Sequence, residues 1–94
     1  MTANSAYALR TTARALRQLT EVLPESVAAA AWELATGPLV HEPHRIGKPL
    51  SGQLAGTWSA RRGTYRLLYE IDEARRTVLL LEVSHRRDTY RRTS

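Results

Sequence analysis

The sequence lacks cysteine, contains a single lysine and has no long apolar run. Without cysteine the chain can form neither a disulfide framework nor a thiolate metal site, which favours a reducing compartment. No apolar run reaches the roughly 18 to 20 residues that span a bilayer. Arg10, Arg14 and Arg17 interrupt the N-terminal segment where a signal peptide would have its apolar region. We therefore expect a soluble, cytoplasmic protein with no membrane partner.

Arginine carries nearly all of the positive charge. Of the 14 basic residues 13 are arginine, and with 9 acidic residues the formal net charge is +5. Nine of the arginines lie from Arg61 onward, where there are five acidic residues. Because arginine binds phosphate bidentately and stacks on bases, this distribution favours a polyanionic partner such as nucleic acid. A strongly acidic protein would satisfy the same charge.

The length of 94 residues predicts one domain, residues 1–94, with a surface groove rather than a deep pocket as its site. Hydrophobic periodicity, caps and turn residues define the elements that precede the C-terminal part. They are a strand at 7–11, a helix through 13–19 capped by Thr11 or Thr12, an alanine-rich helix after Pro24 that Gly37-Pro38 ends, a loop over 40–54 and a strand at 54–62.

Two further strands predict a β-hairpin. Residues 65–71 alternate apolar and polar side chains, a polar loop covers 72–76, and an apolar run follows at 78–83. The narrow alanine stripe of the second helix suits close packing on one side of a sheet. We therefore expect an α+β fold in which two N-terminal helices pack on a small antiparallel β-sheet, with Arg61, Arg66 and Arg86 around a shallow groove on the other side or edge.

The predicted hairpin has a definite register. If 72–76 form the loop, Ile71 faces Thr77 and Tyr65 faces Val83, and one sheet face then carries Arg66, Leu68, Leu80, Ser84 and Arg86. Two neighbouring guanidiniums, Arg66 and Arg86, predict a phosphate site. Alternatively, Glu82 lies directly across from Arg66 in this register and forms an ion pair with it. A slip of one residue would exchange the two faces, so both readings remain open.

His41 and His44 have the spacing of a metal-binding pair. No third histidine or carboxylate is placed convincingly beside them, so we expect surface histidines, no metal site and no cofactor.

The ordered motifs resemble those of the RelE/ParE toxin superfamily over nearly the whole chain. They are Lys48-Pro49-Leu50, the stretch from Gly56 to Arg66 with Tyr69, and Val83-Ser84-His85-Arg86-Arg87 followed by Tyr90. The C-terminal arginine and tyrosine are typical of the RelE branch, whose members are ribosome-dependent mRNA endonucleases. Members of the ParE branch poison DNA gyrase. The resemblance implies a toxin of a type II toxin–antitoxin system with a RelE-like microbial RNase fold, with the ribosome, mRNA and a cognate antitoxin as partners.

The resemblance also implies a chemistry and roles for single residues. The ribose 2′-hydroxyl attacks the adjacent phosphate without a metal and leaves a 2′,3′-cyclic phosphate and a free 5′-hydroxyl. By position, Arg66 and Arg86 match the arginines on the scissile phosphate, Tyr90 matches the tyrosine that stacks on or orients the base, and Arg61 matches one of two basic residues on the preceding strand. Lys48, Arg62 and Arg87 are expected to bind RNA.

The general base is unassigned. Where the best-known RelE pattern has two lysines, this chain has Ser59 and Arg61, and arginine is a poor proton acceptor at neutral pH. His85 is the best candidate on chemistry, although in the predicted register it points away from Arg66, and a histidine at a strand end is often only a surface residue. Three alternatives remain: a ribosome-independent RNase of this fold, a ParE-like gyrase-inhibiting toxin, and a nucleic-acid-binding domain without chemistry.

Overall fold

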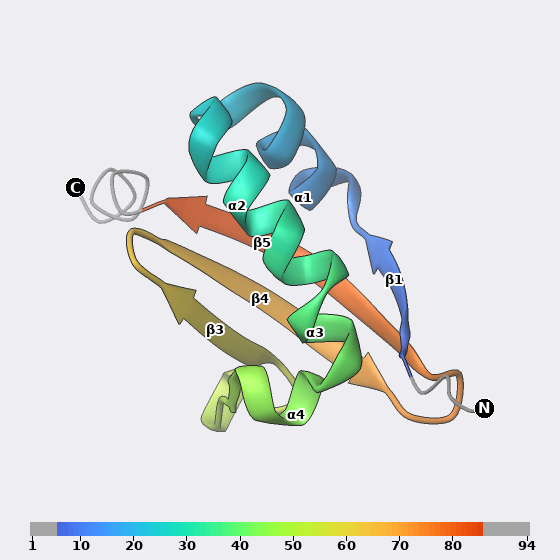
Figure 1. The fold of residues 1–94 in the computed structure, drawn as a ribbon. Coiled ribbons are helices and arrows are strands. Elements are labelled where there is room, and N and C mark those ends of the chain that lie inside the picture. The colour runs from blue at the N-terminus through green and yellow to red at the C-terminus, as the bar shows by residue number, and fades with distance from the viewer. Residues whose placement is uncertain (1–5, 86–94) are drawn as a thin grey trace.

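A five-stranded sheet forms the centre of the protein in a computed structural model that describes residues 6–85 (Figure 1). The strand order is β1-β5-β4-β3-β2. The strands are β1 (Ala8–Thr11), β2 (Lys48–Pro49), β3 (Trp58–Arg62), β4 (Tyr65–Asp72) and β5 (Thr77–His85). The predicted α+β class is confirmed, but the sheet is mixed, because β1 pairs with β5 in parallel while the other pairs are antiparallel.

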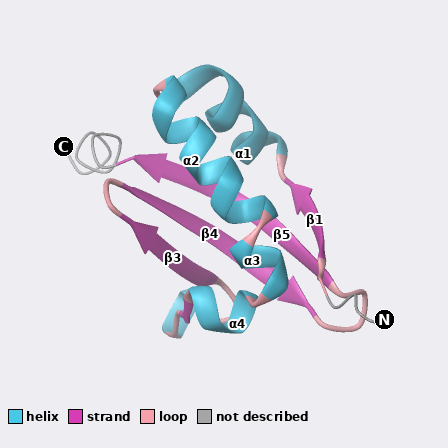
Figure 2. Cartoon of the chain, in the orientation of Figure 1, coloured by secondary structure: helices cyan, strands magenta, loops and turns pink. Residues whose placement is uncertain are grey.

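The helices lie over one face of this sheet (Figure 2). They begin with α1 (Ala13–Arg17), which continues into the π-helical η1 (Gln18–Val22), and α2 (Glu25–Thr36) follows. Thr12 is the N-cap of α1, and its Oγ1 both accepts from Ala15 N at 3.0 Å and donates to Leu81 O at 2.8 Å. The cap therefore starts the helix and also fastens it to β5. No helix within residues 6–85 is long and apolar enough to cross a membrane.

The predicted loop over 40–54 contains regular structure. It includes the second half of the short helix α3 (Pro38–His41), then α4 (Pro43–Ile46), β2 and the 3₁₀ turn η2 (Gly52–Leu54). Each of the two short helices begins with proline, whose fixed φ suits a first helical turn. β3 begins at Trp58 rather than at residue 54, because β4 pairs with β3 only from that residue on.

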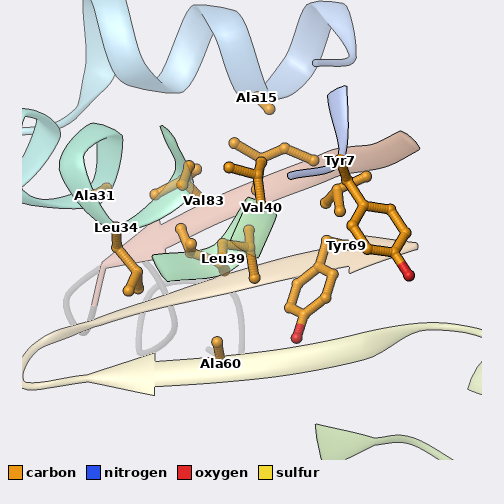
Figure 3. Close-up of a cluster of buried hydrophobic side chains, with 13 residues drawn as sticks. Tyr7, Ala15, Ala31, Leu34, Leu39, Val40, Ala60, Tyr69 and Val83 are labelled. Atoms are coloured by element: carbon orange, nitrogen blue, oxygen red, sulfur yellow. The ribbon is translucent and has the colours of Figure 1, made fainter. Parts of the chain in front are cut away.

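The core lies between the helices α1, α2 and α3 and the sheet (Figure 3). Ala31 and Ala35 are fully buried, so the helix backbone approaches the strands closely, whereas Ala30 is exposed. The sheet contributes buried side chains from three strands, alternating except at the irregularity between Leu80 and Val83 on β5. They are Ala60 on β3, Leu67 and Tyr69 on β4, and Val78, Leu80 and Val83 on β5.

The register of the β4–β5 hairpin differs from the predicted one. Asp72 rather than Ile71 is opposite Thr77, and an irregularity between Leu68 and Tyr69 in the pairing adds one further residue on β5. Tyr65 therefore faces His85, Arg66 faces Ser84 and Glu82 faces Leu68. Because the two one-residue shifts add to an even number, Arg66 and Ser84 still share a face as predicted. Leu80 is opposite the buried Tyr69 and lies on the helix-covered face, so its predicted place was wrong.

Candidate functional site

The turn at Gly63-Thr64 brings two arginines together. It joins β3 to β4 through two residues, with Gly63 at a φ of 57°, as a type II′ hairpin turn requires. This turn fixes Arg62 opposite Tyr65 and Arg61 opposite Arg66. Residues directly opposite on antiparallel strands share a face. Arg61 and Arg66 thus project side by side on the sheet face away from α1 and α2, here called the open face.

Lys48 joins these arginines from β2. It is directly opposite Ser59, and Ser59 and Arg61 lie on the same face because they are two residues apart on β3. Lys48 and Arg61 are therefore diagonal neighbours, with Cα atoms about 7 to 8 Å apart. Lys48, Arg61 and Arg66, here called the cationic patch, are all exposed, and none of them forms an ion pair with another residue of 6–85.

The predicted ion pair between Glu82 and Arg66 does not have the expected geometry. Glu82 faces Leu68, and its Oε1 is 3.9 Å from Arg14 Nε on α1. Ser84 takes the place directly across from Arg66. Glu82 is therefore a diagonal rather than a direct neighbour of Arg66, and it forms an ion pair with Arg14.

Two predicted site residues lie on the other face of the sheet. Arg62 follows Arg61 on β3, so its side chain points to the opposite face. Its Nη1 donates to the Arg61 carbonyl at 3.0 Å. His85 faces Tyr65, whose hydroxyl donates to the Ala30 carbonyl of α2 at 3.3 Å. Arg62 and His85 are thus not gathered with Arg61 and Arg66. Arg86, Arg87 and Tyr90 lie outside the described residues.

Sequence reasoning missed two relationships at the patch. It predicted that Arg66 and Arg86 are neighbours across the β4–β5 hairpin and did not predict that Arg61 lies opposite Arg66. Gly63 before Thr64 was the available signal, because a two-residue turn there fixes the register of β3 and β4. Nothing local predicted that Lys48 would stand opposite Ser59, since β2 is only two residues long.

A second polar cluster lies at the β4–β5 loop. Glu73 pairs with His44 Nε2 and accepts from the Tyr7 hydroxyl at 2.8 Å, while the Arg76 guanidinium lies 4.1 Å from the Tyr7 ring centre. The hydrogen bond to Glu73 is the main cause that raises the pKa of Tyr7. His41, predicted beside His44, instead contacts the Gly37 carbonyl at 2.7 Å. No group of three potential metal ligands occurs within residues 6–85.

Comparison with known proteins identifies the family. Residues 7–90 match the family described as ParE toxin of type II toxin-antitoxin system, parDE. Toxin RelG of Mycobacterium tuberculosis is 56% identical over 86 residues, which is 92% of this chain and 98% of that toxin. Toxin RelE of the same organism is 46% identical over 85 residues, 90% of this chain and 87% of that toxin.

Solved structures agree with this assignment. The toxin–antitoxin complex RelBE2 from M. tuberculosis contains a chain that is 54% identical, with a TM-score of 0.82 over 86% of this chain and 99% of that one. The isolated Escherichia coli RelE toxin shares the fold at 17% identity, with a TM-score of 0.70 over 95% of this chain and 100% of that one. The resemblance predicted from the motifs is thereby confirmed, and the chain belongs to the RelE/ParE family of toxins of type II toxin–antitoxin systems.

Proposed function

We propose that this toxin is a ribosome-dependent mRNA endonuclease that a cognate antitoxin holds inactive. The observation that carries the proposal is the direct opposition of Arg61 and Arg66 on the open face, with Lys48 diagonal to Arg61. Cleavage by the ribose 2′-hydroxyl passes through a phosphorane with an additional negative charge, which preorganised cations stabilise. In this scheme the cationic patch supplies the charge stabilisation that a metal ion supplies in other nucleases.

The members of the cationic patch have different chemical capacities. Arg61 and Arg66 present planar forks that hold two phosphate oxygens each, but they keep their protons at neutral pH. Lys48 carries an ammonium group that can give a proton to the departing 5′ oxygen. We assign the arginines to charge stabilisation and Lys48 to protonation of the leaving group.

The remaining sequence-predicted roles fit around this assignment. Arg86 would be a further phosphate ligand and Tyr90 a stacking platform for the substrate base, with Arg87 binding RNA nearby. His85 and Arg62 are left out of the chemical step because they lie on the face that the helices cover. The group that takes the 2′-hydroxyl proton has no candidate in the cationic patch.

The relatives support an antitoxin as partner. The chain in the RelBE2 toxin–antitoxin complex is 54% identical to this one. A net charge of +5 with an exposed cationic patch also favours an acidic protein that covers the open face.

Ribosomes programmed with a defined message test the proposal. The purified toxin should cut within the decoding region and leave 5′-hydroxyl ends that primer extension maps to single nucleotides. The same RNA without ribosomes should stay intact, and cutting of the naked RNA would instead support a ribosome-independent RNase. Intact messages in both samples would contradict any nuclease function.

Gyrase inhibition is the second candidate, because the matching family is described as ParE toxin. A supercoiling assay with purified DNA gyrase, run beside the ribosome assay, separates the two candidates. Inhibition of supercoiling by equimolar toxin, together with intact mRNA, would support the ParE-like activity.

A further inference from the structure

A hollow of about 320 Å³ lies at the β4–β5 loop end of the sheet. Its charged lining comes from Arg10 on β1, Glu70 and Asp72 on β4, and Arg75 in the loop. Leu79 of β5 stands between Arg10 and Glu70, since it is paired with both across the sheet. We call this feature the distal hollow.

The distal hollow opens on the same face as the cationic patch. Glu70 is four residues from Arg66 on β4, and side chains at positions i, i+2 and i+4 of a strand line one face. At about 3.3 Å per residue, Glu70 is about 13 Å from Arg66 along the strand. A few nucleotides of an extended RNA strand span this distance.

The charged groups of the distal hollow are available to a ligand. Arg10, Glu70 and Arg75 are exposed and form no ion pair with another residue of 6–85, although both signs of charge line the same hollow. Asp72 accepts a hydrogen bond from the Arg75 backbone at 3.1 Å, which fixes the loop that carries the Arg75 side chain. The partly buried Leu79 supplies an apolar surface between these groups.

We propose that the distal hollow is a nucleotide subsite that binds one flanking nucleotide of the RNA whose scissile phosphate lies on the cationic patch. The inference rests on the proposed nuclease function. Arg10 and Arg75 would hold backbone phosphates, and Glu70 would accept hydrogen bonds from an amino group on the edge of the base, as carboxylates do from cytosine N4. Leu79 would contact the face of the base. The volume lies at the lower end of the range for small-ligand sites, which suits one base rather than a folded element.

The mixed charge selects this ligand over others. An acidic peptide would place its carboxylates against Glu70 and Asp72, and an anionic membrane surface would meet the same repulsion. A nucleotide offers the complementary pair, because it has an anionic phosphate and a base edge with hydrogen-bond donors in one unit.

The test compares the cut sites of wild type and Glu70→Ala on a library of messages in programmed ribosomes. Sequencing of the 5′ ends should show that Glu70→Ala loses about 5-fold or more of the base preference at one flanking position. Preferences at the nucleotides beside the cut should persist. Glu33→Ala, an exposed change on α2, is the matched control and should keep the wild-type pattern at every position. If Glu70→Ala gives the same pattern as Glu33→Ala, the assignment of Glu70 as a base-reading residue is overturned.

A binding measurement keeps this inference separate from the proposed function. Fluorescence anisotropy with labelled single-stranded RNA should give a smaller salt slope for Arg10→Ala than for wild type, by about 0.7 for one lost phosphate contact. Arg45→Ala on α4 is the control, because it removes an exposed arginine on another element. Equal slopes in the two variants would overturn the distal hollow as an RNA site even if wild type cleaves mRNA. If wild type cleaves nothing, the proposed function fails, and the slopes alone decide whether the hollow binds RNA.

Discussion

Arg61 on β3 and Arg66 on β4 are directly opposite each other on the open face of the sheet. Like charges in such cross-strand pairs destabilise a sheet, and neither arginine forms an ion pair with another residue of 6–85. The two-residue turn at Gly63-Thr64 enforces the pairing nonetheless. A phosphate between the two guanidiniums would replace this repulsion with attraction, so the arrangement is better suited to a complex with an anion than to the free protein.

Replacing either arginine should separate activity from stability. We expect Arg61→Ala and Arg66→Ala each to lower the single-turnover rate of cleavage on the ribosome by about 100 to 1,000-fold, the usual effect of removing one contact to transition-state charge. Thermal unfolding should be unchanged or shifted slightly upward, because the repulsion disappears. Arg45→Ala is the control for loss of one positive charge. Wild-type cleavage by Arg66→Ala would contradict the role of the cationic patch.

Lys48 offers a test of proton transfer as distinct from charge. Lys48→Arg keeps the positive charge but loses the ability to give up a proton at neutral pH. We expect a loss of about 100-fold or more, the scale of general acid catalysis. A message with sulfur in place of the bridging 5′ oxygen at the cut site needs no proton on its leaving group and should restore the rate of Lys48→Arg. Failure of this substrate to rescue the variant would show that Lys48 acts only through charge or position.

His85 should contribute little to the chemical step. It faces Tyr65 on the helix-covered side of the sheet, away from Arg66. We expect His85→Gln to lower single-turnover cleavage by less than about 10-fold, below the 100 to 10,000-fold of a general acid or base. A larger loss, with thermal unfolding unchanged, would restore His85 as the proton acceptor.

Local signals predicted much of the fold because the interactions behind them are local. The threonine cap at Thr12, the helix start after Pro24 and the period-two alternation of β4 each depend on neighbours a few residues away. The parallel pairing of β1 with β5 joins residues almost 70 positions apart and left no such signal. The same holds for Gln18, whose Oε1 accepts from Val83 N at 2.7 Å on β5.

The site was harder to predict because its geometry depends on register. The bulge on β5 and the loop length each moved the β4–β5 pairing by one residue, and neither has a glycine to mark it. Residue types indicated phosphate as the class of ligand to look for. Which cation stands beside which depended on strand pairing, and so Lys48 opposite Ser59 became visible only in three dimensions.

Gly47 should be required for the packing of α4 against the sheet. A Cβ at this position would lie 2.4 Å from the Tyr69 hydroxyl and 2.8 Å from the Ser59 carbonyl oxygen. We expect Gly47→Ala to lower the free energy of unfolding by about 1 to 3 kcal/mol, as overpacking does, measured by urea denaturation. Adding Tyr69→Phe removes the closer of the two contacts and should recover part of the loss attributable to Gly47→Ala. Strict additivity of the two changes would contradict this cause.

Tyr69 should make stability depend on pH in the alkaline range. Its side chain is fully buried and its hydroxyl donates to the Pro43 carbonyl at 2.6 Å. Burial raises the pKa of Tyr69 from the ordinary value of 10.0 to about 12. The folded state therefore holds this proton more tightly than the unfolded state, so the contribution of Tyr69 to stability is complete below pH 10.0 and is lost as the pH rises through about 12.

We expect the free energy of unfolding, measured in urea at intervals above pH 9, to fall more steeply for wild type than for Tyr69→Phe, which cannot ionise at this position. At pH 8 the variant should already be less stable by about 1 to 3 kcal/mol, because the Pro43 carbonyl loses its donor. Tyr65→Phe is the comparison variant, because it also removes one phenol. Burial raises the pKa of Tyr65 as well. Parallel curves for wild type and Tyr69→Phe across the alkaline range would show that this buried phenol does not control the loss of stability.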